Sequence, residues 1–138
     1  MNFKLLITAA TLALALVTSA SAKIELPSMK AHNLMKKMNY AASQAAKKET
    51  GEEAKINAFI KSLNSRLEEY KEAVMESCVA SWGVEKAGAC SCFSEQFNYQ
   101  LEFRANAVYF VTDNNQKELE ALAAETNAVA QKCGIPLE

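Results

Sequence analysis

Glycine and proline most often interrupt a helix, and this chain of 138 residues has only four glycines and two prolines. The glycines stand at 51, 83, 88 and 134, and the prolines at 27 and 136. Between them apolar residues recur every three or four positions, which is the period of an α-helix. No run alternates in polarity in the way a half-buried strand does. The sequence therefore predicts an all-α fold.

The spacing of these residues and of the polar turn residues predicts four helices. The first covers about 27–48, and the second runs to about residue 82 from a capping box in which Thr50 is the N-cap and Glu53 stands three residues on. The third ends near residue 111. The fourth follows a turn cluster at 112–115 and ends at Cys133, with Gly134 as the C′ glycine. Long helices with short connections favour an antiparallel, up-down-up-down four-helix bundle.

The first 22 residues have the layout of a cleavable secretory signal peptide. Lys4 supplies the positive charge, residues 5–17 are mostly apolar, and Ala20 and Ala22 form the small-residue cleavage motif. The apolar stretch is shorter than the ~20 residues of a membrane-spanning helix, so we expect no stable membrane insertion after cleavage. The predicted mature chain is one disulfide-stapled helical domain, residues 23–138. It would be periplasmic or secreted.

All four cysteines (Cys78, Cys90, Cys92 and Cys133) lie in the predicted mature chain. An even number of cysteines in a small exported domain predicts disulfides. Two helical positions turn by about 200°, so Cys90 and Cys92 face opposite sides of the third helix and should bond two different neighbours. Two pairings remain open: Cys78–Cys90 with Cys92–Cys133, or Cys78–Cys92 with Cys90–Cys133.

Two groups of residues are alternative metal ligands. The four cysteines are chemically suited to Zn²⁺ or Cu(I), although an oxidising compartment disfavours free thiolates. Met29, His32, Met35 and Met38 have the soft donors that copper prefers. Their steps of three spread them over about half of the helix circumference, so we expect core methionines and a surface histidine. The sequence therefore predicts no metal centre and no cofactor.

The third predicted helix is apolar on two nearly opposite sides. One side carries Cys90, Phe93 and Phe97, and the other carries Tyr99, Phe103 and Phe110. A helix that is apolar on two sides is typically buried on two sides. The alternative is that Tyr99, Phe103 and Phe110 stay partly exposed and bind a partner. The sequence leaves both interpretations open.

Charge and motifs exclude several classes of function. The net charge is −1, and removal of Lys4 with the signal peptide leaves 14 basic and 16 acidic residues, or −2. With no basic block, nucleic acid is not the expected partner. A single histidine, and no catalytic spacing around it, argue against an enzyme.

We expect an exported protein with a non-enzymatic binding role and an unknown protein partner. It would be an inhibitor or an envelope accessory factor. A copper- or zinc-binding protein and a carrier of a small apolar ligand are the alternatives.

Overall fold

The computed structural model describes residues 25–136, which form six α-helices and two short 3-10 helices and contain no strand. The prediction of an all-α fold is therefore confirmed for these residues. The predicted signal peptide and its cleavage site lie outside them. The elements in chain order are η1 (Pro27–Met29), α2 (Lys30–Lys47), α3 (Glu52–Asn64), α4 (Leu67–Trp82), η2 (Val84–Lys86), α5 (Ala87–Gln96), α6 (Tyr99–Thr112) and α7 (Gln116–Cys133).

Two of the four predicted helices are interrupted. The second becomes α3 and α4, separated at Ser65 and Arg66, and the third becomes α5 and α6, separated at Phe97 and Asn98. Neither interruption contains glycine or proline. Polar side chains bond the backbone instead: the Ser65 hydroxyl donates to the Ser62 carbonyl over 2.6 Å, and Asn98 Oδ1 accepts from the Leu101 amide over 3.0 Å.

One predicted helix cap is wrong and another is confirmed. Gly51, with φ of 94°, occupies the N-cap of α3, and no side chain caps that end, so Thr50 and Glu53 form no capping box. A φ in this range suits glycine because a Cβ would crowd the backbone. Gly134 ends α7 in the left-handed region, with φ of 76°, as predicted.

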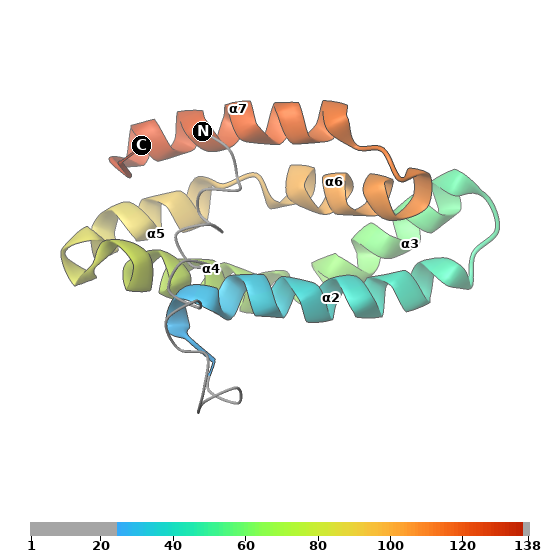
Figure 1. Cartoon of the computed structure of the whole chain (residues 1–138), viewed down its shortest axis with the longest axis horizontal. Coiled ribbons are helices and arrows are strands. Elements are labelled where there is room, and N and C mark those ends of the chain that lie inside the picture. Colours follow the sequence, from blue (N-terminus) through green and yellow to red (C-terminus); the bar gives the residue numbers. More distant parts are fainter. Residues whose placement is uncertain (1–24, 137–138) are drawn as a thin grey trace, which may run out of the picture.

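The helices pack in chain order when α3 with α4, and α5 with α6, are each taken as one interrupted helix. α2 packs against α3 and α4, α3 against α6, α4 against α5, and α7 against α5 and α6. Figure 1 shows α7 along one side of α5 and α6, with α2, α3 and α4 on the other side. The α2–α3 and α6–α7 connections lie at the same end of the molecule, and the α4–α5 connection lies at the opposite end.

One contiguous core joins all six helices, and its largest fully buried side chains include Phe59, Phe103, Met38 and Leu63. α7 contributes little to this core. Its buried residues are only Leu122, Thr126 and Ala130, and one of them is polar. The burial of α7 is therefore narrow, and the Cys92–Cys133 disulfide also joins it to α5.

Candidate functional site

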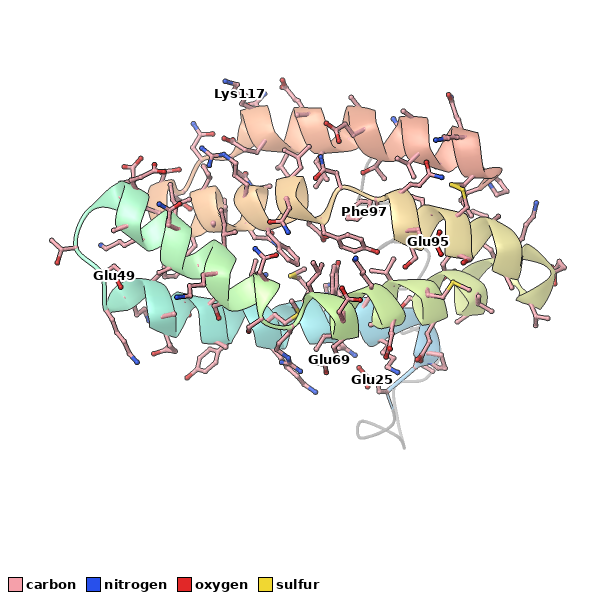
Figure 2. All side chains as sticks on the ribbon, turned by 180° about the vertical axis from the view of Figure 1, so that it is seen from behind. Glu25, Glu49, Glu69, Glu95, Phe97 and Lys117 are labelled. Atoms are coloured by element: carbon pink, nitrogen blue, oxygen red, sulfur yellow. A yellow bond between two sulfur atoms is a disulfide. The ribbon has the colours of Figure 1, made fainter. Side chains whose placement is uncertain are left out.

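The two disulfides gather at the end of the molecule that holds the α4–α5 connection. Cys78–Cys90 joins α4 to α5 with a Cα–Cα distance of 5.7 Å, and Cys92–Cys133 joins α5 to α7 with a distance of 5.5 Å (Figure 2). The structure thus selects one of the two predicted pairings. Cys90 and Cys92 bond neighbours on opposite sides of α5, as the 200° rotation between them requires. Two intramolecular disulfides are consistent with an oxidising extracellular environment.

The two disulfides differ in burial. Cys78 is 4% exposed and Cys90 is fully buried, whereas Cys92 and Cys133 are half-buried. The Gln96 side-chain amide lies 3.4 Å from Cys92 Sγ and donates a weak hydrogen bond to it. The bridge that holds α7 is therefore the one closer to solvent.

The candidate copper ligands differ in their burial. Met29, Met35 and Met38 are buried in or beside the core, and Met35 Sδ accepts a hydrogen bond from the Asn106 amide. His32 is half-buried, and burial, followed by the nearby Lys36 charge, lowers the pKa of its imidazole. Within residues 25–136, no group of three or more His, Cys, Asp or Glu side chains is placed to hold a metal ion.

The predicted interaction stripe is mostly buried. Tyr99 is 5% exposed and Phe103 is fully buried, so neither is accessible to a partner in this structure. Phe110 is 39% exposed, and its ring centre lies 5.3 Å from that of Phe59 in the core. Of the three, only Phe110 reaches the surface.

Two further exposed apolar residues, Tyr109 and Leu119, lie near Phe110 in the sequence. Tyr109 and Phe110 lie in the last turn of α6, and Leu119 lies in the first turn of α7. Tyr109 is 56% exposed and Leu119 is 47% exposed. These three residues, together with the α6–α7 connection between them, are called the α6–α7 tip below.

Polar residues lie along the α7 part of this tip. A shallow concavity at the start of α7 is lined by Asn114, Gln116, Lys117, Glu118 and Glu120.

The connection within the tip is held by hydrogen bonds. Asp113 adopts the left-handed conformation with φ of 60°, the Thr112 hydroxyl donates to the Val108 carbonyl over 2.7 Å, and the Asn115 amide donates to the Ala105 carbonyl over 2.9 Å. The turn is therefore preorganised, which reduces the entropy lost when a partner binds.

A second feature missed from the sequence is a buried polar cluster where the helices are interrupted. The Tyr70 hydroxyl donates to Glu102 Oε1 over 2.9 Å, and Glu102 is only 3% exposed. Burial raises the pKa of Glu102 to about 8, although the hydrogen bond from Tyr70 opposes this shift. Burial also raises the pKa of Tyr70 well above its usual value. Glu102 is therefore largely protonated at neutral pH.

Tyr99 extends this cluster to α4 and α5. Its hydroxyl donates to the Ser94 carbonyl, and the Ser94 hydroxyl lies 3.0 Å from the Lys71 carbonyl. The Lys71 ammonium lies 5.7 Å from the centre of the Tyr99 ring. Burial is the main cause that raises the pKa of Tyr99 to about 12. The cluster lies inside the core and connects α4, α5 and α6, so its effect is on helix packing.

Comparisons with protein-family models, with curated proteins and with solved structures give no match to this chain. No helix in the described part of the chain has the length and apolar character needed to cross a membrane. Any proposal of function for this chain therefore rests on its own residues.

Proposed function

We propose that the chain is an exported, non-enzymatic binding protein that contacts a protein partner through its α6–α7 tip. The observation that carries this proposal is the joint exposure of Tyr109, Phe110 and Leu119 beside a hydrogen-bonded turn. The partner would be an enzyme that this protein inhibits or a component of the cell envelope that it assists.

Export is supported by two independent features. The first 22 residues have the pattern of a signal peptide, and the two intramolecular disulfides suit an oxidising periplasmic or extracellular compartment. The mature protein would be a single domain, residues 23–138. It would be a four-helix antiparallel bundle in which α3–α4 and α5–α6 each count as one interrupted helix.

Binding at the tip is supported by its side chains and its rigidity. Aromatic residues at the centre of a contact supply much of the binding energy of protein interfaces. Here two aromatic side chains and a leucine are exposed within a few residues of one turn. Because hydrogen bonds already order this turn, the turn loses little conformational entropy when a partner binds to it.

The test uses the mature protein and a variant in which Tyr109→Ser and Leu119→Ser are combined. Val84→Ser is the matched control, because Val84 is 76% exposed but lies at the α4–α5 end of the molecule. Each protein is used to capture partners from envelope and culture-fluid fractions, and recovery is measured by mass spectrometry.

The wild type and the control should recover the same stoichiometric protein, and the tip variant should recover about tenfold less of it. Equal recovery with all three proteins, or the absence of a stoichiometric partner, would contradict the proposal.

A further inference from the structure

The first long helix carries charge of one sign only. Residues 30–48 contain five lysines and no acidic residue. The rest of the described chain contains eight basic and fifteen acidic residues. The segment therefore carries +5, and the remainder carries −7 if every carboxyl group is ionised. A nearly neutral protein thus has strong charge asymmetry.

Four of these lysines share one exposed face with an aromatic side chain. Lys36, Lys37, Lys47 and Lys48 are exposed, and Tyr40, which lies between the two pairs, is 70% exposed. At 100° per residue the five positions fall within an arc of about 120°, and at 1.5 Å per residue they span about 18 Å. These five residues are called the α2 basic face below.

Two acidic side chains near α2, Glu69 and Glu76, form ion pairs with basic residues outside this face, whereas Glu49, which follows Lys48, forms none with any described residue. Glu76 accepts a 2.7 Å bond from Lys30, which lies outside the α2 basic face. Glu69 accepts two bonds of 2.8 Å from Arg66. Among the described residues, none of the four lysines of the face forms an ion pair. The opposite side of α2 packs against α3 and α4, so the basic face is directed away from the protein.

We propose that the α2 basic face binds the protein peripherally to an anionic lipid surface. The lysines would contact phosphate groups of the lipids, and the Tyr40 ring would lie at the boundary between headgroups and acyl chains. This inference goes beyond the α6–α7 tip and does not depend on it. Binding of this kind needs no inserted helix.

Lipid phosphates fit this face better than an acidic protein does. The face is a single convex stretch of helix, and its charges are flexible lysines, whose ammonium groups act as point charges. A pocket for one carboxylate would favour an arginine, whose planar group binds both oxygens. An array of mobile phosphates requires no such geometry. A tyrosine with an apolar ring and a polar hydroxyl suits a membrane interface.

The test is vesicle flotation with the mature protein. Vesicles of phosphatidylcholine alone are compared with vesicles that also contain phosphatidylglycerol. Binding should require phosphatidylglycerol and should weaken as salt is added. Changing Lys36, Lys37, Lys47 and Lys48 to Gln should lower the partition coefficient roughly a hundredfold or more, because each lysine near an anionic leaflet contributes roughly fivefold.

The matched control removes the same charge elsewhere, by changing Lys55, Lys61, Lys117 and Lys132 to Gln. This control should retain most of the binding. Circular dichroism verifies that both variants remain helical. The wild-type protein allows a second measurement, because His32 is its only histidine and lies one helical turn before Lys36. Anionic vesicles should raise the pKa of His32, measured by nuclear magnetic resonance.

Three results would overturn the inference. The first is equal binding to neutral and anionic vesicles. The second is an equal loss of binding in both lysine variants. The third is the absence of binding to phosphatidylglycerol vesicles, together with binding of an acidic protein through these lysines. That result would assign the face to a protein partner instead.

Discussion

The Tyr70 hydroxyl donates a 2.9 Å hydrogen bond to Glu102, and each of the two residues lies one helical turn beyond an interruption. The Tyr70 amide bonds the Arg66 carbonyl, and the Glu102 amide bonds the Asn98 carbonyl. The hydroxyl of Tyr70, in the first turn of α4, thus has its hydrogen-bond acceptor in the first turn of α6. This relationship couples the two interruptions, because a shift of either helix would leave a buried polar group without its partner.

Replacement of Glu102 by Gln should make stability less dependent on pH. In the folded protein Glu102 has a pKa of about 8, against an ordinary value of 4.5. Between these values the unfolded chain loses a proton that the folded chain keeps, so stability falls as pH rises from about 4.5 to about 8. The cost accumulated by pH 8 is on the order of 3–5 kcal/mol. Glutamine resembles the protonated acid and should remove most of it.

The measurement is urea unfolding of the wild type and of Glu102→Gln at several pH values between 5 and 8. The control is Glu95→Gln, because Glu95 is exposed on α5. The control should keep the wild-type pH dependence. If Glu102→Gln also kept it, the carboxyl group of Glu102 would not be the group that titrates.

The two disulfides should differ in their resistance to reduction. Cys92 and Cys133 are half-buried, whereas Cys78 and Cys90 are almost inaccessible. A reducing dithiol such as dithiothreitol should therefore open Cys92–Cys133 first. Alkylation of the released thiols at increasing dithiothreitol, followed by peptide mass mapping, measures the order. Simultaneous opening, or earlier labelling of Cys78 and Cys90, would contradict this prediction.

Loss of the Cys92–Cys133 disulfide should loosen α7 before the other helices. This bridge spans 41 residues, and the chain-entropy model assigns it about 4 kcal/mol, compared with about 3 kcal/mol for the separation of 12 in Cys78–Cys90. In a variant with alanine at both Cys92 and Cys133, amide hydrogen exchange should accelerate most in α7. The matched variant with alanine at Cys78 and Cys90 should leave α7 protected relative to α4 and α5.

Asn98 should be important for the start of α6. Its side-chain oxygen caps the Leu101 amide, and its side-chain nitrogen donates to Glu125 of α7 over 2.7 Å. Asn98→Ala should lower the free energy of unfolding by about 1–2 kcal/mol. Asn98→Ser, which keeps a capping oxygen, should recover about half of that loss. Thermal or urea unfolding measures both, and equal stability of the two variants would show that the cap contributes nothing.

The helical regions could be predicted from the sequence because each has an apolar face with helical spacing, but the interruptions could not. Breaks at Ser65–Arg66 and Phe97–Asn98 have no glycine or proline. The side chains that bond the backbone there, Ser65 and Asn98, also occur inside helices. The reciprocal amide bonds between Asn64 and Gln100 add contacts between segments far apart in sequence. Local propensity contains no information on such contacts.

The candidate sites were predictable to different degrees. The 200° rotation between Cys90 and Cys92 predicts that they bond two separate neighbours. It does not predict which cysteine faces α4, because that depends on how α5 is oriented in the fold. Glu102 had a detectable signal, because positions 99, 102, 103, 106 and 110 follow one helical face that is otherwise largely aromatic. The exposure of Tyr109 and Leu119 had no detectable signal in the sequence, because it results from the geometry of the turn that ends α6.

Thr126→Val should stabilise the protein, although most substitutions in a core destabilise it. Thr126 is 6% exposed on the buried side of α7, and its hydroxyl has no hydrogen-bond partner among the described residues. Valine has nearly the same shape and removes this unsatisfied group, so the free energy of unfolding should rise by about 1 kcal/mol. The matched control is Thr112→Val. The Thr112 hydroxyl donates to the Val108 carbonyl, so its removal should lower the free energy of unfolding by a similar amount. Urea unfolding compares the two, and a loss of stability in Thr126→Val would mean that its hydroxyl has a partner, such as a bound water.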